Sequence, residues 1–251
     1  MAAHVEGQFA EVFFTPINLG GGCNLVCTAT HLALTRLIDK YRNSLDDLGS
    51  HIVDNCVSEN KNNFFLGYAG LLVAASVIRV VEIHFMMVGH THIKIDQIFS
   101  MFSRGIKGKN IFTRTQLGEE LQASYTEVLV YYKTLQNQGN FKGLLRGRVN
   151  HVPNITSCRA FCVEKGGDGR VKVSVKQYMH NTEWGGIGGD LAMDPKAPSH
   201  DLFIGHPPRI QDTPPYQLKS VPKDVIGKVA QRYRASHKRL PAAYPLGKSI
   251  F

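Results

Sequence analysis

Apolar and polar positions along the first 140 residues form blocks that predict strands followed by helices. The predicted strands cover residues 11–18, 50–55 and 80–89. The predicted helices cover residues 24–43 with Asn24 as N-cap, 62–77, a segment that starts near Ile93, and 115–135 with Thr115 as N-cap. This alternation is typical of an α/β domain whose neighbouring strands are joined by crossovers. We therefore expect the three strands, which end at Asn18, Asp54 and Val88, to share one sheet, with the apolar 62–77 helix buried against it.

The pattern changes after residue 140. Segments rich in β-forming residues, 158–164 and 170–178, flank the sequence KGGDG, which predicts a β-hairpin. Residues 185–222 are rich in Gly and Pro and predict a linker or an extended wrap, whereas 223–239 predict a short basic helix. The expected organisation is an α/β core over 1–140, a β-hairpin extension over 141–184, and a Gly/Pro-rich linker with a basic C-terminal segment over 185–251.

The charge of the chain is unevenly distributed. Residues 1–100 carry 6 Lys+Arg and 9 Asp+Glu, a balance of −3, and residues 101–251 carry the other 23 and 11, a balance of +12. Such an excess favours a polyanionic partner, because each neutralised phosphate releases counterions, although a basic surface without a ligand has the same composition. The predicted partner is DNA; no membrane and no small-molecule cofactor are expected, and a homo-oligomer is allowed.

Composition also bears on the compartment. The chain has no run of about 18 apolar residues and no basic start followed by an apolar block, so neither a membrane span nor a secretory signal is expected. Five cysteines are too few and odd in number for a disulfide framework, and they favour buried reduced thiols over a split zinc site. We expect a nuclear or cytoplasmic protein that is not secreted.

The first candidate motif is VDNCVSENKN, residues 53–62. A strand that ends at Asp54 and is followed by a long helix places this carboxylate at the carboxyl edge of a sheet, where α/β proteins bind ligands. Glu59 adds a second carboxylate and Lys61 adds a cation near the start of the helix. An alternative remains open, in which Asp54, Asn55 and Asn60 only make turn and cap hydrogen bonds.

The second candidate motif is VGHTHIKIDQIF, residues 88–99, where another strand is predicted to end. His92 and Asp96 are four residues apart and would share one helical face, which could bind a divalent metal or orient a water. His90 and His92 could instead only cap the helix. If Asp54 and Asp96 converge, they provide the carboxylates that hold Mg²⁺ or Mn²⁺ in two-metal phosphodiester chemistry.

Together the two blocks, DNC-x-x-ENKN and VGHTH-x-x-x-D-x-x-FS, resemble the catalytic core of DDE-type, RNase H-like transposase-derived proteins of a largely uncharacterised eukaryotic family. The resemblance extends from about Phe13 to about Trp184. It implies an RNase H-like, three-layer α/β sheet with helices on both faces, with Asp54 as the second acid and Asp96 as the third. The first acid of such folds lies on an earlier strand. The residues before Phe13 contain Glu6 and Glu11 but no Asp, so the opening strands are expected to be missing.

These observations predict a transposase- or integrase-like domain with an incomplete acidic site, or a non-catalytic remnant that binds nucleic acid or a protein. The predicted catalytic residues are Asp54, Asp96 and Glu59, and the predicted metal ligands are Asp54, Asp96 and His92. The predicted nucleic-acid-binding residues are Lys61, Arg146, Arg148, Arg232, Arg234, Lys238 and Arg239. The predicted supporting residues are Asn55, Asn60, Asn62 and His90. Trp184 is expected to be a core or hairpin anchor rather than a base-stacking residue.

Overall fold

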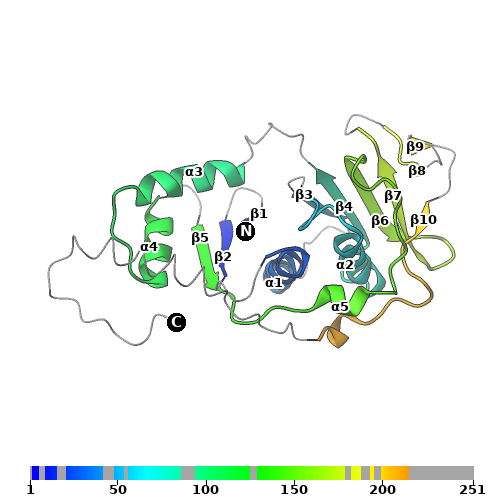
Figure 1. The fold of residues 1–251 in the computed structure, drawn as a ribbon, viewed down its shortest axis with the longest axis horizontal. Coiled ribbons are helices and arrows are strands. Elements are labelled where there is room, and N and C mark those ends of the chain that lie inside the picture. Colours follow the sequence, from blue (N-terminus) through cyan, green and yellow to red (C-terminus); the bar gives the residue numbers. More distant parts are fainter. Residues whose placement is uncertain are drawn as a thin grey trace, which may run out of the picture. The chain divides into compact units, whose positions relative to one another are not determined.

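The computed structural model divides the chain into two compact units, Met1–Gln217 and Leu218–Phe251. The described residues all belong to the first unit, and they are 2–5, 9–15, 21–41, 48–53, 56–85, 94–124, 129–178, 182–187, 193–194 and 199–214. The basic helix predicted over 223–239 therefore lies outside the described residues. The first unit is a mixed α/β domain (Figure 1).

Its helices are α1 (Cys23–Tyr41), α2 (Asn63–Ala74), α3 (Lys94–Ile106), α4 (Arg114–Ser124), α5 (Phe141–Leu145) and the 3-10 helix η2 (Ile210–Asp212). Its strands are β1 (Ala2–Val5), β2 (Phe9–Phe14), β3 (Leu48–Val53), β4 (Val80–Phe85), β5 (Leu129–Thr134), β6 (Ala160–Lys165), β7 (Val171–Lys176), β8 (Gly186–Ile187), β9 (Met193–Asp194) and β10 (His200–Asp201). No described helix has the length and apolar character needed to cross a membrane.

The larger sheet has five strands in the order β10-β7-β6-β4-β3. Strands β3 and β4 are parallel, whereas β4–β6, β6–β7 and β7–β10 are antiparallel. The hairpin predicted around KGGDG is confirmed, since β6 and β7 pair from Ala160↔Lys176 to Lys165↔Val171. Gly169 has φ +77°, a left-handed conformation that glycine adopts without steric cost. The hairpin pairs with β4, so it belongs to the same sheet as the strands of the predicted core.

The smaller sheet has the order β1-β2-β5 and corrects two expectations. Strand β2 was expected in one sheet with β3 and β4, but it lies in a separate sheet and pairs in parallel with β5. The helix predicted over 115–135 ends at Ser124, and Leu129–Thr134 of the predicted helix form β5. The sequence of β5, LVYYKT, explains this, because β-branched and aromatic residues favour a strand. Alternation of strands and helices indicates crossovers, but it does not determine which strands pair.

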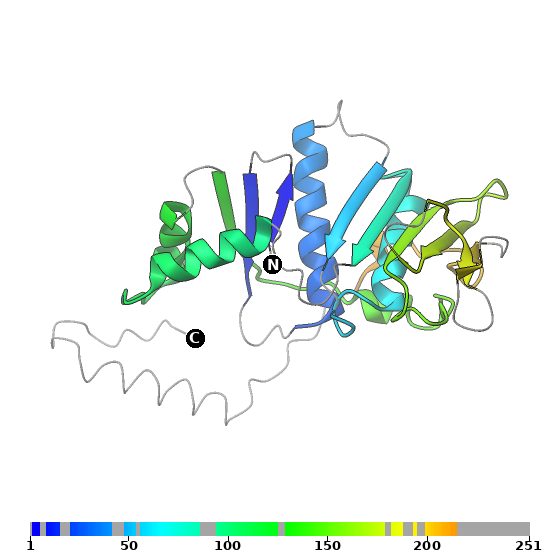
Figure 2. The ribbon, with the colours of Figure 1, turned by 90° about the horizontal axis from the view of Figure 1, so that it is seen from above.

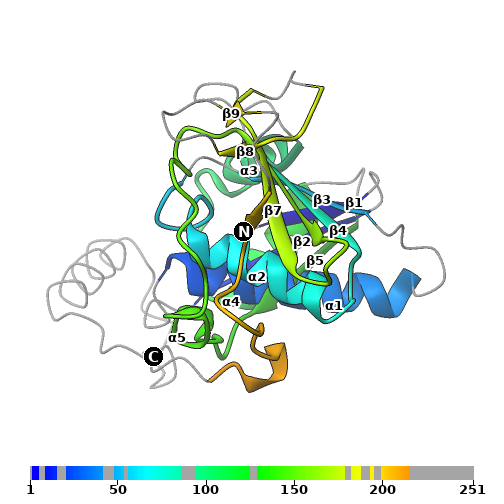
Figure 3. The ribbon, with the colours of Figure 1, turned by 90° about the vertical axis from the view of Figure 1, so that its right-hand side faces the viewer.

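Helix α2 is buried, as predicted, from Phe65 to Val73. It begins after Asn62, whose side-chain oxygen accepts hydrogen bonds from the backbone N–H groups of Phe64 and Phe65 at 3.1 and 3.0 Å. The helix packs on one face of the five-stranded sheet, against β4, β6 and β7 (Figure 3). The second helical layer predicted for the opposite face of this sheet is not seen among the described residues.

Two helix starts differ from the prediction. Asn24 lies inside α1 rather than at its cap; its side chain accepts from the backbone N–H of Lys142 at 2.8 Å and donates to the Asn140 side chain at 3.3 Å. Helix α4 is capped by Thr113 instead of Thr115. The Thr113 hydroxyl accepts from the backbone N–H of Gln116, and the Gln116 side chain accepts from that of Thr113, which is a capping box.

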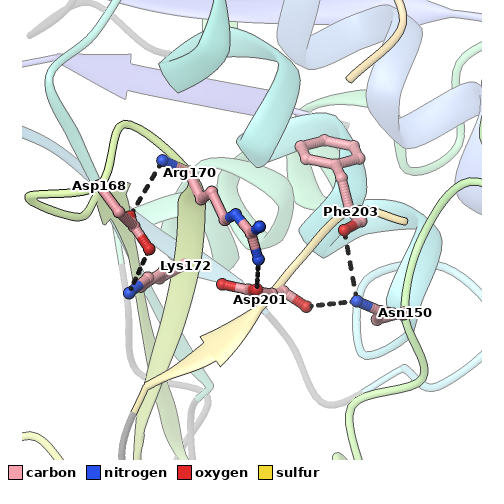
Figure 4. Close-up of polar contacts among 6 residues, drawn as sticks. All are labelled: Asn150, Asp168, Arg170, Lys172, Asp201 and Phe203. Atoms are coloured by element: carbon pink, nitrogen blue, oxygen red, sulfur yellow. Dashed lines mark hydrogen bonds and ion pairs between the residues drawn. The ribbon is translucent and has the colours of Figure 1, made fainter. Parts of the chain in front are cut away.

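Residues 199–214 form an extended segment along the domain, in agreement with the predicted wrap for this part of 185–222. Leu202 and Phe203 are buried against α2, where a Cβ on Gly70 would lie 2.5 Å from Leu202 Cδ2. Polar contacts fix the segment at the surface (Figure 4): Arg170 pairs with Asp201 at 2.9 Å, and the Asn150 side chain donates to the Asp201 carbonyl at 2.8 Å.

Candidate functional site

The candidate site is the carboxyl edge of the parallel strands β3 and β4 (Figure 2). The two strands are paired in register from Leu48↔Val80 to Val53↔Phe85, so they end side by side. Asp54 follows Val53 directly, and the 88–99 motif starts three residues after Phe85. The predicted pairing of the two motif-bearing strands is therefore confirmed. One segment with carboxylates, and another with a carboxylate and imidazoles, thus follow neighbouring strand ends, which is where α/β domains bind ligands.

Several predicted site residues lie outside the described residues: Asp54, Asn55, His90, His92, Arg232, Arg234, Lys238 and Arg239. Asp96 lies in the first turn of α3, and its side chain is outside the described part. A carboxylate near a helix N-terminus is favoured by the helix dipole.

The turn after β3 is held by backbone hydrogen bonds, because the N–H groups of Asn60 and Lys61 both donate to the carbonyl of Cys56, at 2.8 and 3.1 Å. Asn62 connects this turn to α2, since its side-chain nitrogen donates to the carbonyls of Val57 and Glu59 at 3.1 Å each. Asn62 is thus the N-cap of α2, whereas the sequence had suggested turn and cap hydrogen bonds for Asp54, Asn55 and Asn60. Glu59 is half-buried beside Gly21, where a Cβ would lie 3.8 Å from Glu59 Oε1.

Lys61 is the most unusual described residue of the edge. It is only 2% exposed, and its Nζ lies 5.1 Å from the centroid of the Phe85 ring. Burial, and after it the positive charge of Arg159, lower the pKa of Lys61 to about 8. A lysine with this burial at a sheet edge differs from the exposed phosphate-contacting lysine that the sequence suggested.

The described residues contain no group of three or more His, Cys, Asp or Glu side chains that could hold a metal ion. Of the predicted acids, only the Glu59 side chain is described. The described side chains alone therefore do not make up a metal centre.

The described cysteines are free thiols, as predicted; four are buried and Cys56 is partly exposed. Burial raises the pKa of Cys27 well above its usual range and that of Cys162 to about 12. Thiols of this kind stay protonated at neutral pH and do not act as nucleophiles.

Arg146 and Arg148 are exposed at and after the end of α5, as a nucleic-acid contact would require. Sequence reasoning missed Arg159, which precedes β6 and whose carbonyl accepts from the Phe85 N–H at 2.8 Å. Only the pairing of β6 with β4 brings it to the edge, and no local pattern indicates that contact.

A family model described as a domain of unknown function (DUF7869) matches residues 2–181, a range that includes both motifs and the β6–β7 hairpin. No curated protein matches the chain, and no solved structure matches it.

Proposed function

The chain belongs to the DUF7869 family, and we propose that its α/β domain is an RNase H-like domain of the transposase and integrase kind. In this proposal it binds a divalent cation, Mg²⁺ or Mn²⁺, at the carboxyl edge of β3 and β4. Its chemistry is related to metal-dependent cleavage and transfer of DNA strands. The observation that carries the proposal is the parallel, in-register pairing of β3 and β4, each followed by a segment with an Asp.

The proposed roles follow from the chemistry of the side chains. Asp54 and Asp96 are the proposed catalytic acids and metal ligands, because divalent hard cations prefer carboxylate oxygens. His92 is the proposed third ligand, and Glu59 is the additional carboxylate of the first motif. When bound, the cation would activate an attacking oxygen and stabilise a leaving one.

Efficient cleavage by the isolated chain is not expected. Two-metal chemistry needs a further acid on a neighbouring strand, and the sequence before Phe13 contains Glu6 and Glu11 but no Asp. Another segment or subunit would have to supply that acid. We therefore expect the isolated chain to bind the cation but not to cleave DNA strands efficiently.

Titration of the full chain with Mg²⁺ and Mn²⁺ by calorimetry tests the proposal. Weak binding is expected, reduced at least about tenfold, or about 1.4 kcal/mol, by Asp54→Asn or Asp96→Asn. Asp212→Asn is the matched control, because Asp212 is an exposed carboxylate in η2 and should have no effect. Mg²⁺-dependent cleavage of supercoiled DNA that Asp54→Asn abolishes would show that the acidic site is complete. Absence of any cation binding would refute the metal site.

A second candidate function is nucleic-acid binding without catalysis. The observation in its favour is the charge balance of +12 after residue 100, together with exposed Arg146 and Arg148. If about four phosphates of a duplex are neutralised, log K should fall against log salt with a slope near −3.6. A flat salt response, or equal binding after removal of 223–251 and neutralisation of Arg146 and Arg148, would contradict this candidate.

A further inference from the structure

An aromatic and basic surface lies at the end of β7 and in the segment that follows. It consists of Lys176, Tyr178 and Trp184, and we call it the Trp184 surface. The Nζ atom of Lys176 lies 4.3 Å from the centroid of the Trp184 ring, a cation–π contact. Tyr178 is 52% exposed, and Trp184 is partly exposed. The Lys176–Trp184 pair is thus partly exposed to solvent, and a second exposed ring, Tyr178, follows Lys176 by two residues in the sequence.

Backbone pairing fixes Trp184 beside the strand. The next residue, Gly185, exchanges two hydrogen bonds with Val175, N–H to carbonyl in both directions, at 2.8 and 3.1 Å. Lys176 is the last residue of β7 and is paired with Ala160 of β6. The side chains of Lys176 and Trp184 are therefore positioned by the sheet rather than by a free loop.

The Trp184 surface adjoins the candidate edge. The carbonyl of Lys176 accepts from the N–H of Arg159 at 2.8 Å, and the carbonyl of Arg159 accepts from the N–H of Phe85 at 2.8 Å. Because β4 and β7 are both antiparallel to β6, the ends of β4 and β7 lie at the same edge of the sheet. A strand of nucleic acid on this surface would lie next to the end of β4.

The ammonium of Lys176 differs from the other cationic groups of the hairpin in the partner that it contacts. Arg170 is paired with Asp201 at 2.9 Å and Lys172 with Asp168 at 3.0 Å (Figure 4). Lys165, at the opposite end of the hairpin, donates to the Ser76 hydroxyl. Lys176 has no ion pair with a described residue and lies on an aromatic ring instead. The nearby acid in sequence, Glu183, is exposed. The ammonium of Lys176 can therefore contact an external anion.

We propose that the Trp184 surface binds a single-stranded nucleic acid, with bases stacked on Trp184 and Tyr178 and a phosphate held by Lys176. Stacking on aromatic rings combined with a cationic contact is how proteins bind single strands without sequence preference. The bases of a duplex already stack on one another, so they do not offer their faces to such rings. This inference rests on the proposed function, because it names the contact that would hold a strand at the same edge.

The sole tryptophan of the chain makes the proposal directly measurable. We would titrate the full chain with a 12-nucleotide single strand, as DNA and as RNA, and with the corresponding DNA duplex, and follow tryptophan fluorescence. A stacked base should quench the fluorescence, for the single strands more than for the duplex. Similar quenching by DNA and RNA would indicate that the rings recognise bases alone; a difference would show that the 2′-hydroxyl also contributes.

The affinity of variants for a labelled single strand, measured by fluorescence anisotropy, tests the contribution of each side chain. Trp184→Ala should weaken binding by about 5-fold to 150-fold, whereas Trp184→Phe, which keeps a ring, should weaken it much less. Lys176→Gln should make the salt slope shallower by about 0.7, the value for one phosphate of a single strand. Lys165→Gln removes the same charge from the other end of the hairpin and should leave both values unchanged. Circular dichroism and thermal melting would verify that each variant is folded.

The Trp184 surface and the proposed metal site can be refuted independently of each other. Unquenched fluorescence on binding, or equal affinity of wild-type protein and a folded Trp184→Ala variant, would overturn the Trp184 surface even if Mg²⁺ binds. Quenching with the expected variant effects, but without Mg²⁺ binding, would support the surface and refute the metal site. Tighter binding of the duplex, unaffected by Trp184→Ala, would also overturn the inference.

Discussion

Helix α1 contributes side chains to two cores, one with the five-stranded sheet and one beside the three-stranded sheet, and these cores differ. Cys23, Val26 and Cys27, at the start of α1, belong to the core that includes α2 and the inner face of the five-stranded sheet. Ala29 and Ala33, further along, contact Phe13 and Leu135 in the core beside the three-stranded sheet. Among the described side chains, the first core has many large aliphatic and aromatic residues, whereas the second has two, Phe13 and Leu135, packed on two alanines of α1.

Among the described side chains, the five-stranded sheet therefore has the larger buried core. Burial of apolar area is the main stabilising contribution to folding, so the five-stranded sheet should provide most of the stability of the described unit. The candidate edge and the Trp184 surface both belong to that sheet. Residues placed on a well-packed element are held more accurately than residues on a marginal one. The sheet with the larger core is therefore the better support for a binding site.

Truncation of one large side chain in each core is the strongest test of this comparison. Phe161 is 0% exposed and lies 5.7 Å from the Phe85 ring in a T-shaped contact, so Phe161→Ala should lower the free energy of unfolding by about 3–5 kcal/mol. Leu135→Ala should lower it by about 2 kcal/mol, because its smaller core leaves fewer contacts to lose. Urea denaturation measures both values. Equal losses would show that the two cores contribute alike.

Alanine at Gly70 and at Gly118 should change the free energy of unfolding by less, and in different directions. Gly70 lies in α2 against Leu202 and Phe203, which are 0% and 7% exposed and cannot move aside easily. Gly70→Ala should therefore destabilise the protein by about 1–2 kcal/mol, despite the better helix propensity of alanine.

Gly118 of α4 is the matched position beside the smaller sheet. An added Cβ would meet the ring of Tyr132, which is 39% exposed and can turn toward solvent. Gly118→Ala should be neutral or stabilise the protein by up to about 1 kcal/mol through helix propensity. Thermal melting of both variants would measure the difference, and a loss at Gly118 as large as that at Gly70 would refute the distinction.

The sequence predicted the elements of the larger core better than those of the smaller one. Helix α2, strands β3 and β4 and the β6–β7 hairpin have long apolar runs or a clear turn signal, and burial agrees with local propensity there. Strand β5 was predicted as the continuation of the 115–135 helix, whose start has a clear cap signal but whose end has none. Its pairing with β2 depends on contacts more than 100 residues apart in sequence, which a local pattern does not contain.

Some features of the candidate site could be predicted from the sequence, and others could not. A carboxylate directly after a strand is visible in the sequence, and the pairing of β3 with β4 followed from their order. The burial of Lys61 was not visible, since a lysine in a polar turn is usually exposed. Arg159 and Trp184 reach the edge only through the antiparallel pairing of β6 and β7. The separation of Asp54 and Asp96 stays a prediction, because neither side chain is described.

A further expected effect concerns the pH dependence that Lys61 gives to the free energy of unfolding. Its pKa is lowered from 10.5 to about 8 in the folded chain, so between these values the unfolded chain binds more protons. The free energy of unfolding should therefore rise with pH in that window, by at most about 1.4 kcal/mol per pH unit from this group. Below about pH 8 both states are protonated and the contribution is constant.

Urea denaturation at pH 7, 8, 9 and 10 should show that wild-type protein gains stability relative to Lys61→Met across the window. Lys165→Met, at a more exposed lysine, should run parallel to wild type. If stability plotted against pH also runs parallel for Lys61→Met and wild type, the Lys61 ammonium is solvated in the folded chain. The edge would then lack the buried cation that distinguishes it from the rest of the sheet.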